Sequence, residues 1–308
     1  MEWSPICAKD VAEALRTTLN WKAPGRDQIP NFWLKQFTAT LKHIAAIFNK
    51  LIEEDQMPEW LTAGVTFLIP KNEYTENPKN YRPVTFLPTM YKLITCIISR
   101  HMQKYMDDEN LITKEQKGCY RGSKECKDQL LISKAILQEC KRRKKNLSMA
   151  WVDYHNAFDR VPHIWIIKSL ELIGINNKFI LFTKKVMTYW KTRMCLHAEN
   201  KLLETEDIKI QCEIFQGDSL SPLLFCICLI PLTEQLNRLN TGYEEHTTKT
   251  KISHLLYMDD LKLTAKSKEE LQKQIQTVKT FSNDINMEFE LKKCAKIMFK
   301  RGKLTHKI

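Results

Sequence analysis

Four consecutive residues, Tyr257-Met258-Asp259-Asp260, separate two short stretches in which apolar side chains recur. Ile252 to Leu256 alternates weakly before them, and Leu261 to Lys266 alternates clearly after them. Alternation is typical of strands, whereas Asp is poorly suited to strand interiors and common in turns. The sequence therefore predicts a β-hairpin with two adjacent carboxylates at its tip. Taken alone, the four residues fit an ordinary polar turn equally well.

A second strand-like stretch, Leu147 to Asp153, also ends in a carboxylate. If Asp153 and Asp259 lie close together, their charges repel unless a divalent cation lies between them. Oxygen ligands from few residues suit Mg²⁺, which keeps water ligands and takes up substrate phosphates. Two such ions support in-line phosphoryl transfer. Hydrolytic nucleases also use acidic metal ligands, so these residues alone leave the reaction open.

Composition favours a polyanionic partner. The 308 residues include 48 Lys and Arg against 36 Asp and Glu, which gives a net charge of +12. Nucleic acid is the first expectation and an anionic membrane the second. The longest apolar run, Leu223 to Leu232, is too short to span a bilayer. The ten cysteines form no C-x-x-C pair, which argues against a zinc site and for free thiols in a reducing compartment.

The order of the expected elements indicates an α+β chain, because strands and helices interleave without a regular βαβ period. Besides the hairpin, strands are expected at 65–71, 147–153, 192–198, 206–214 and 294–300. Helices are expected at 8–20, from the turn at 21–30 to about 54, and at 89–107, 125–143, 162–173, 176–190, 221–240 and 267–284. Ser267 with Glu270 forms a capping box at the start of the last helix.

Two features of the loops have alternative explanations. The basic run Lys141 to Lys145 at a helix end either complements the helix dipole or forms part of a phosphate-contacting track. Four of the eight glycines, Gly25, Gly118, Gly122 and Gly217, lie in loops beside Lys, Arg or Gln. Each marks an ordinary turn or a place where the backbone comes close to a ligand.

Several motifs in chain order resemble the reverse transcriptase domain of a non-LTR (LINE-type) retrotransposon. The matching segments are Trp21 to Asp27, Ile69 to Lys71, Asn80 to Pro83, Gln116 to Ser123 with Asp128 to Leu130, Asp153 to Asp159, Gln216-Gly217 with Ser221-Pro222, Tyr257 to Asp260, and Asn286 to Lys293. Met258, His155 and Asn156 depart from the residues usual in that group. The resemblance covers nearly the whole chain.

The resemblance implies a metal site formed by acidic residues. Asp153 and Asp259 would be the two metal ligands, and Asp260 the third acidic residue, near the metals or the primer end. The main-chain carbonyl of Tyr154 would complete one coordination sphere. Two Mg²⁺ ions would be the cofactor, with Mn²⁺ as a possible substitute.

It also implies a set of nucleotide-binding residues. Lys71 and Arg82 would hold the incoming triphosphate, and each is otherwise a surface cation. Phe158 would exclude a 2′-hydroxyl, or else be a core phenylalanine. Gln216 and Gly217 would lie against nucleotide and template. Lys293 would protonate the pyrophosphate leaving group, or else be a surface lysine.

The expected fold is then a right-hand polymerase fold with fingers and palm, in which the thumb is missing or rudimentary. Residues 1–146 would form an N-terminal extension and fingers, and 147–308 a palm, with a helical insertion at 160–205 and truncation before the thumb. A longer polyprotein would supply the thumb and an endonuclease.

The expected function is RNA-directed DNA polymerisation by two-metal nucleotidyl transfer of dNTPs onto a primer 3′-OH. The partners would be an RNA template, a DNA primer and dNTPs, with no membrane, in the cytoplasm and nucleus. Two alternatives remain: a reverse transcriptase of the group II intron or retron type, and a catalytically inactive, truncated nucleic-acid-binding remnant.

Overall fold

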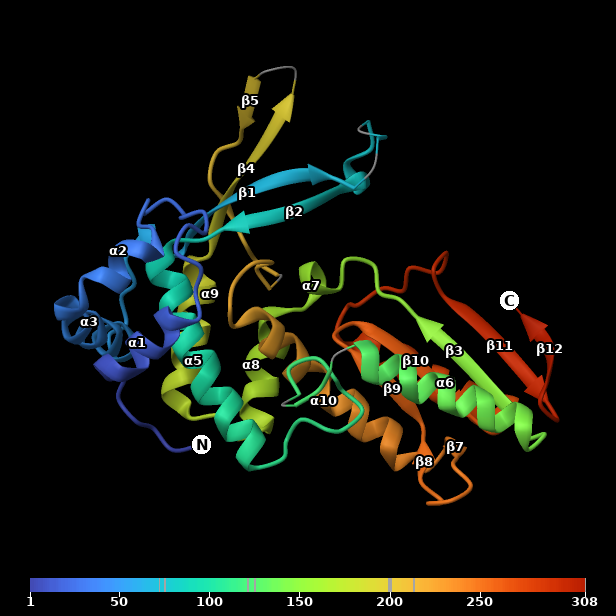
Figure 1. Ribbon diagram of the computed structural model, residues 1–308. Coiled ribbons are helices and arrows are strands. Elements are labelled where there is room, and N and C mark those ends of the chain that lie inside the picture. Colours follow the sequence, from blue (N-terminus) through green and yellow to red (C-terminus); the bar gives the residue numbers. More distant parts are fainter. Residues whose placement is uncertain are drawn as a thin grey trace. The chain divides into compact units, whose positions relative to one another are not determined.

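The computed structural model (Figure 1) describes the chain except residues 72, 75, 121, 125, 199–200, 213 and 308, and the side chains of 79, 198, 306 and 307. The chain forms two compact units. The first comprises Met1–Tyr105 and Ile166–Ser221, and the second Met106–Trp165 and Pro222–Ile308. The chain thus enters each unit twice. The division into fingers and palm at residues 146 and 147 is a functional assignment and stays a prediction.

Several helices belong to the first unit. They are α1 (Ala8–Arg16), α2 (Asn31–Gln36), α3 (Leu41–Glu53), α4 (Glu59–Thr62), α8 (His163–Leu172, from Ile166 onward), α9 (Asn177–Tyr189) and α5 (Thr89–Asp108, up to Tyr105). The long helix expected to reach residue 54 is interrupted, because Phe37 leaves the helical conformation with ψ 62° and a 3-10 turn, Thr38–Thr40, follows. Helix α3 buries Ile44, Phe48 and Ile52, which recur every four residues on one face.

A sheet of order β2-β1-β4-β5, with β6 also paired to β4, completes the first unit. Its strands are β1 (Ala63–Pro70), β2 (Tyr81–Phe86), β4 (Lys191–Ala198), β5 (Lys201–Glu204) and β6 (Ile208–Lys209). Strand β1 pairs with β2 antiparallel and with β4 parallel. The strand expected at 206–214 is wrong in extent: among the described residues of this stretch, only Ile208 and Lys209 pair with β4, because the chain then turns inward and buries Ile210.

The second unit contains an antiparallel sheet of order β12-β11-β3-β10-β9. Its strands are β3 (Leu147–Val152), β9 (His254–Tyr257), β10 (Asp260–Ala265), β11 (Ala295–Lys300) and β12 (Lys303–Lys307), and β7 (Tyr243–Glu244) pairs with β8 (Lys251–Ile252). The predicted hairpin is therefore present as β9 and β10. The edge strand β12 was not predicted.

The second unit also contains the helices α6 (Cys126–Arg142), the short α7 (Ala157–Arg160), α10 (Ser221–Arg238, from Pro222 onward) and α11 (Lys268–Asp284). Ile136 and Cys140 of α6 pack on Leu147 and Met149 of β3, and Figure 1 shows α6 lying across the strands. Helix α11 packs against β3 and β10. The Ser267 hydroxyl accepts a hydrogen bond from Glu270 N–H at 3.2 Å, as a helix N-cap.

Each unit contains both helices and a sheet, so the predicted mixture of helix and sheet is confirmed. All ten cysteines are free. In the part of the chain that the structure describes, no helix is long and apolar enough to cross a membrane.

Candidate active site

The register of two neighbouring strands brings the predicted carboxylates together. Strand β3 pairs antiparallel with β10, and Val152 lies opposite Leu261. Asp153 directly follows Val152 and Asp260 directly precedes Leu261, so both carboxylates lie at this end of the paired strands. Asp259 precedes Asp260 in the turn that joins β9 to β10, where Tyr257 pairs with Asp260. Residues more than 100 positions apart in the chain thus share one end of the sheet.

The side chain of Gln116, for which the sequence predicted no individual role, stabilises the turn between β9 and β10. Met258 has φ 52°, a left-handed conformation that β-hairpin turns of two residues require. The Gln116 side chain accepts hydrogen bonds from Met258 N–H at 3.1 Å and Gly118 N–H at 2.8 Å, and donates one to the Met258 carbonyl at 3.4 Å. Gln116 is only 4% exposed. Its position in a family motif is a signal for importance, but its contact with the hairpin cannot be read from the sequence.

Replacing Gln116 with alanine is expected to destabilise the second unit by about 1–3 kcal/mol, because buried N–H groups of Met258 and Gly118 lose their acceptor. Urea denaturation of the purified protein measures this change. Gln116→Glu keeps the acceptor oxygens and serves as the conservative comparison. An unfolding free energy unchanged in Gln116→Ala would show that the turn holds its conformation without this side chain.

The carboxylates experience an unfavourable electrostatic environment. Burial, followed by the negative charges of Asp260 and Asp153, raises the pKa of Asp259 above its ordinary value. Burial and then the charge of Asp153 likewise raise the pKa of Asp260. Lys293 partly offsets both shifts, and its Nζ lies 3.6 Å from Asp153 Oδ1. The Lys293 side chain is 66% exposed, so solvent screens this ion pair and the pair is weak.

The donor chemistry of this site fits Mg²⁺. Carboxylate oxygens are the protein ligands that this ion prefers. Burial and then mutual repulsion raise the pKa of Asp259 and Asp260, and a bound divalent cation would offset the repulsion. Among the described residues, no three His, Cys, Asp or Glu side chains already converge into a metal-binding group. Metal ligation by Asp153, Asp259 and Asp260 therefore stays a prediction from their chemistry.

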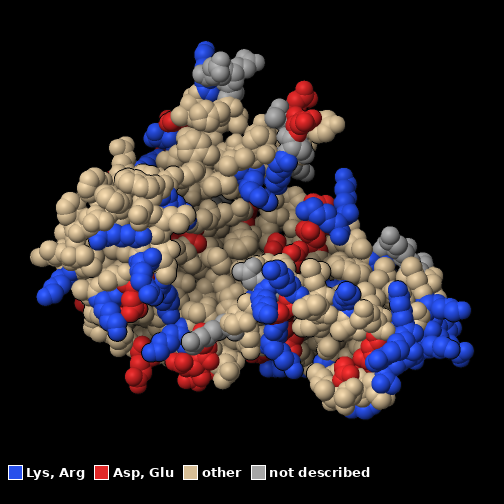
Figure 2. Space-filling model, in the orientation of Figure 1, with Lys and Arg blue, Asp and Glu red and all other residues tan. Residues whose placement is uncertain are grey.

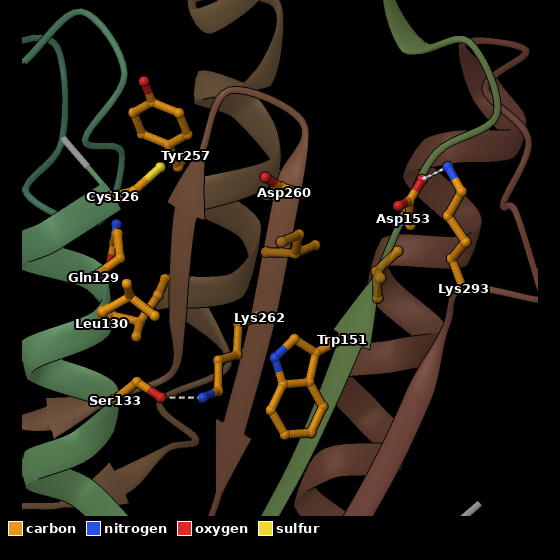
Figure 3. Close-up of a pocket in the computed structure, with 13 residues that line it drawn as sticks. Cys126, Gln129, Leu130, Ser133, Trp151, Asp153, Tyr257, Asp260, Lys262 and Lys293 are labelled. Atoms are coloured by element: carbon orange, nitrogen blue, oxygen red, sulfur yellow. Dashed lines mark hydrogen bonds and ion pairs between the residues drawn. The ribbon is translucent and has the colours of Figure 1, made fainter. Parts of the chain in front are cut away.

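A pocket of about 380 Å³ adjoins the carboxylates within the second unit. Figure 3 shows Asp153, Asp260 and Lys293 at one end of the pocket, and Lys262 between Ser133 and Trp151 at the other. The Lys262 ammonium donates to the Ser133 hydroxyl and lies 4.6 Å over the Trp151 ring. Burial lowers the pKa of Lys262 to about 8. Its place two residues after Asp260 was a signal that the sequence analysis did not use.

Tyr154 and Phe158 follow Asp153 and are both anchored. Tyr154 is 3% exposed, and its hydroxyl lies 3.0 Å from Ser282 Oγ. Burial raises the pKa of Tyr154 to about 12. Phe158, in α7, is half-buried and stacks on Phe225 of α10 with 4.4 Å between ring centroids. This contact orients the ring, and its predicted role in sugar selection stays a prediction.

The other predicted nucleotide-binding residues belong to the first unit. Arg82 pairs with Ile69 across β1 and β2, and Lys71 donates its N–H to the Asn80 carbonyl at 2.6 Å. By this register, the two cations lie diagonally on one face of the hairpin. The Gln216 carbonyl accepts a hydrogen bond from Thr85 N–H of β2 at 3.3 Å, and Gly217 follows with φ 115°. These four residues thus lie around one strand hairpin. Arg121 of the Gln116 to Ser123 motif lies outside the described residues.

Asp218, next to Gly217, is a buried residue that the sequence analysis missed. It is 6% exposed and accepts hydrogen bonds from Thr95 Oγ1 at 2.5 Å and from Ser219 N–H at 2.8 Å. Burial raises the pKa of Asp218 to about 6. These bonds tie the Gln216-Gly217 turn to α5. An acidic residue after a Gln-Gly turn was the only signal for this anchor.

Comparison with solved structures defines the class of fold. The chain is similar to telomerase from Candida tropicalis, in a form truncated from its C-terminal domain, with a TM-score of 0.56 and 15% sequence identity. The match covers 82% of this chain and 55% of that one. At this identity the likeness concerns the fold alone, and it supports a polymerase fold.

The sequence comparisons then give the family. The model of the family described as "Reverse transcriptase (RNA-dependent DNA polymerase)" matches residues 69–306, and the chain belongs to this family. The Pol polyprotein of the type-1 retrotransposable element R2 of Popillia japonica is 27% identical over 96% of this chain. The RNA-directed DNA polymerase from mobile element jockey of Drosophila melanogaster is 22% identical over 90%. The chain spans 40% of the R2 polyprotein and 30% of the jockey protein. The predicted resemblance to non-LTR reverse transcriptases is confirmed.

Proposed function

We propose that this chain is the RNA-directed DNA polymerase domain of a non-LTR retrotransposon, which adds deoxynucleotides to a primer 3′-hydroxyl opposite an RNA template. One observation carries the proposal: Asp153 directly follows β3 and Asp260 begins β10 at the same end of two paired strands, with Asp259 beside Asp260 in the turn. The relatives R2 and jockey favour this type over the group II intron or retron type.

The proposed roles follow from the chemistry of each side chain. Two divalent ions, when bound, would activate the attacking hydroxyl and neutralise charge on the leaving pyrophosphate. The carboxylates of Asp153, Asp259 and Asp260 would coordinate these ions at this end of the sheet, and the Tyr154 carbonyl would complete the set of ligands. The Lys293 ammonium, beside Asp153, donates a proton to the pyrophosphate.

Nucleotide binding is assigned to the remaining predicted residues. Lys71 and Arg82 offer two cations on one face of a hairpin, which suits a triphosphate. Gln216 and Gly217 lie against the nucleotide and template. The ring of Phe158, fixed by its stacking on Phe225, excludes a ribose 2′-hydroxyl.

The assignment of parts to the fold is also a proposal. The β1–β2 hairpin would belong to the fingers and the five-stranded sheet to the palm, and no described residue is assigned to a thumb. Since the R2 relative is more than twice as long as the matched segment, we infer that a longer protein carries this domain. Action in the cytoplasm and nucleus is proposed from the element type alone.

Purified protein should extend an oligo(dT) primer on poly(rA) with dTTP and Mg²⁺, and EDTA should abolish the extension. Extension by a longer version of the chain, from the same gene, serves as the positive reference. If neither protein extends the primer with Mg²⁺ or Mn²⁺ while both remain folded by circular dichroism, the proposed activity is wrong. Retained binding of nucleic acid would then favour the inactive remnant.

A further inference from the structure

The second unit brings two basic segments, more than 150 residues apart, into one surface. The turn between β11 and β12 packs on the end of α6: Gly302 N–H donates to the Lys145 carbonyl at 2.8 Å, and Arg301 N–H donates to Asn146 Oδ1 at 2.9 Å. Figure 2 shows Lys and Arg gathered where Figure 1 places these two elements. The basic patch consists of Lys141, Arg142, Arg143, Lys144, Lys145, Lys300, Arg301 and Lys303.

Most of this charge is not neutralised by the protein. Within the described residues, only Arg143 and Lys145 of the patch have an ion pair, both with Glu139. The other six cations are exposed. Glu245 borders a groove with Lys141 and Arg142, but its carboxylate accepts hydrogen bonds from Thr247 N–H and Thr248 N–H. Concentrated like charge destabilises the fold by self-repulsion, so an anionic partner is the simplest reason for it.

Two of the cations occupy backbone positions that disfavour them. Lys144 has φ 52° at the end of α6, where Lys145 N–H bonds to the Cys140 carbonyl at 3.0 Å and Lys144 N–H to the Lys141 carbonyl at 3.4 Å. This is a Schellman motif, whose left-handed residue is usually Gly. Arg301 has φ 49° in the two-residue turn of the β11–β12 hairpin, a position that favours Asn. Local backbone preference therefore does not explain these side chains.

The basic patch lies far from the carboxylates. Strand β3 begins next to the patch, ends next to Asp153 and spans about 20 Å. Helix α6 starts at the pocket that Asp153 borders, and its 17 residues cover about 25 Å before the patch. A nucleic-acid strand whose end lies at the carboxylates would need about six or seven nucleotides to reach the patch.

We propose that the basic patch is a second nucleic-acid site, which binds the phosphate backbone of a segment away from the primer end. Phosphates of a continuous strand match a row of exposed cations without requiring base-specific contacts. On this proposal the run Lys141 to Lys145 contacts phosphates, together with Lys300, Arg301 and Lys303, and does more than complement the helix dipole. The inference rests on the proposed function only for the choice of nucleic acid as the polyanion.

The test is a double variant, Lys144→Gly with Arg301→Asn, which removes two charges and supplies the residues that the backbone prefers. Binding of a 60-nucleotide RNA and of a 40-base-pair DNA is measured by fluorescence anisotropy between 50 and 300 mM KCl. The matched control, Lys273→Gln with Lys279→Gln, removes two exposed charges from α11. We expect the patch variant to have a higher denaturation midpoint than wild type.

For at least one nucleic acid, the patch variant should bind about tenfold more weakly, and its salt slope should fall by about 1.4–1.8. Comparison of the RNA titration with the DNA titration shows which nucleic acid supplies the phosphates. Affinity and salt slope equal to those of the control variant would overturn the proposal. Binding to phosphatidylserine vesicles is measured in parallel, and a patch variant that loses vesicle binding but keeps its affinity for both nucleic acids would also overturn it. Asp259→Asn protein should give the same patch-dependent binding, so failure of primer extension leaves this test intact.

Discussion

Asp259→Asn is expected to lower the rate of primer extension by about 10³-fold or more, which corresponds to about 4 kcal/mol of lost transition-state stabilisation. The amide is nearly the same size as the carboxylate but brings no negative charge to the site. The folded protein should not be weakened. Because the pKa of Asp259 is raised by burial and by Asp260 and Asp153, keeping it ionised at neutral pH opposes folding, and the neutral side chain removes that opposition.

The measurement pairs steady-state primer extension with urea denaturation of the same preparation. Asp284→Asn is the matched control, since Asp284 is exposed at the end of α11 and should leave both quantities unchanged. Loss of extension together with loss of stability would assign Asp259 a structural role. Extension retained in Asp259→Asn would remove this residue from the proposed catalytic set.

The carboxylate pair was the part of the site most accessible from sequence. Period-two patterns before Asp153 and around Asp259 predict strands without knowledge of any partner, and the structure contains both as β3 and the β9–β10 hairpin. The pairing of β3 with β10 joins segments that are distant in the chain, and local sequence patterns do not predict it. The family resemblance supplied this link, and the register of Val152 with Leu261 gives its geometry.

The residues that support the site could not be predicted in the same way. Gln116 and Asp218 act through hydrogen bonds to Met258 N–H and Thr95, which lie more than 100 residues away along the chain. Lys262 looked like one polar position in an alternating strand, and only the packing of α6 places Ser133 beside it. The interrupted helix near Phe37 is a further case, where local sequence left the break unmarked.

Gly25→Ala is expected to destabilise the first unit by about 3 kcal/mol or more, one of the largest stability effects of any single methyl group in the chain. A Cβ at this position would lie 2.4 Å from the carbonyl carbon and oxygen of Leu87 and from Pro88 N. These are backbone atoms, so no side-chain rotation relieves the overlap, and overpacking alone costs about 1–3 kcal/mol where neighbours can adjust. The segment around Gly25 also positions α5, because Asp27 Oδ2 accepts a hydrogen bond from Met90 N–H at 3.1 Å.

The comparison variant Gly122→Ala separates the effect of steric overlap on stability from the effect of backbone conformation. Among the described residues, no atom lies within 4 Å of a Cβ placed at Gly122, but φ is +76°, so alanine there suffers the left-handed strain of about 1–2 kcal/mol. Unfolding free energies from urea titration should therefore rank Gly25→Ala as clearly the more damaging. Equal losses, or a smaller loss at Gly25, would mean that the segment from Trp21 to Asp27 can move away from Leu87. In that case close backbone approach would not be why glycine occupies this loop.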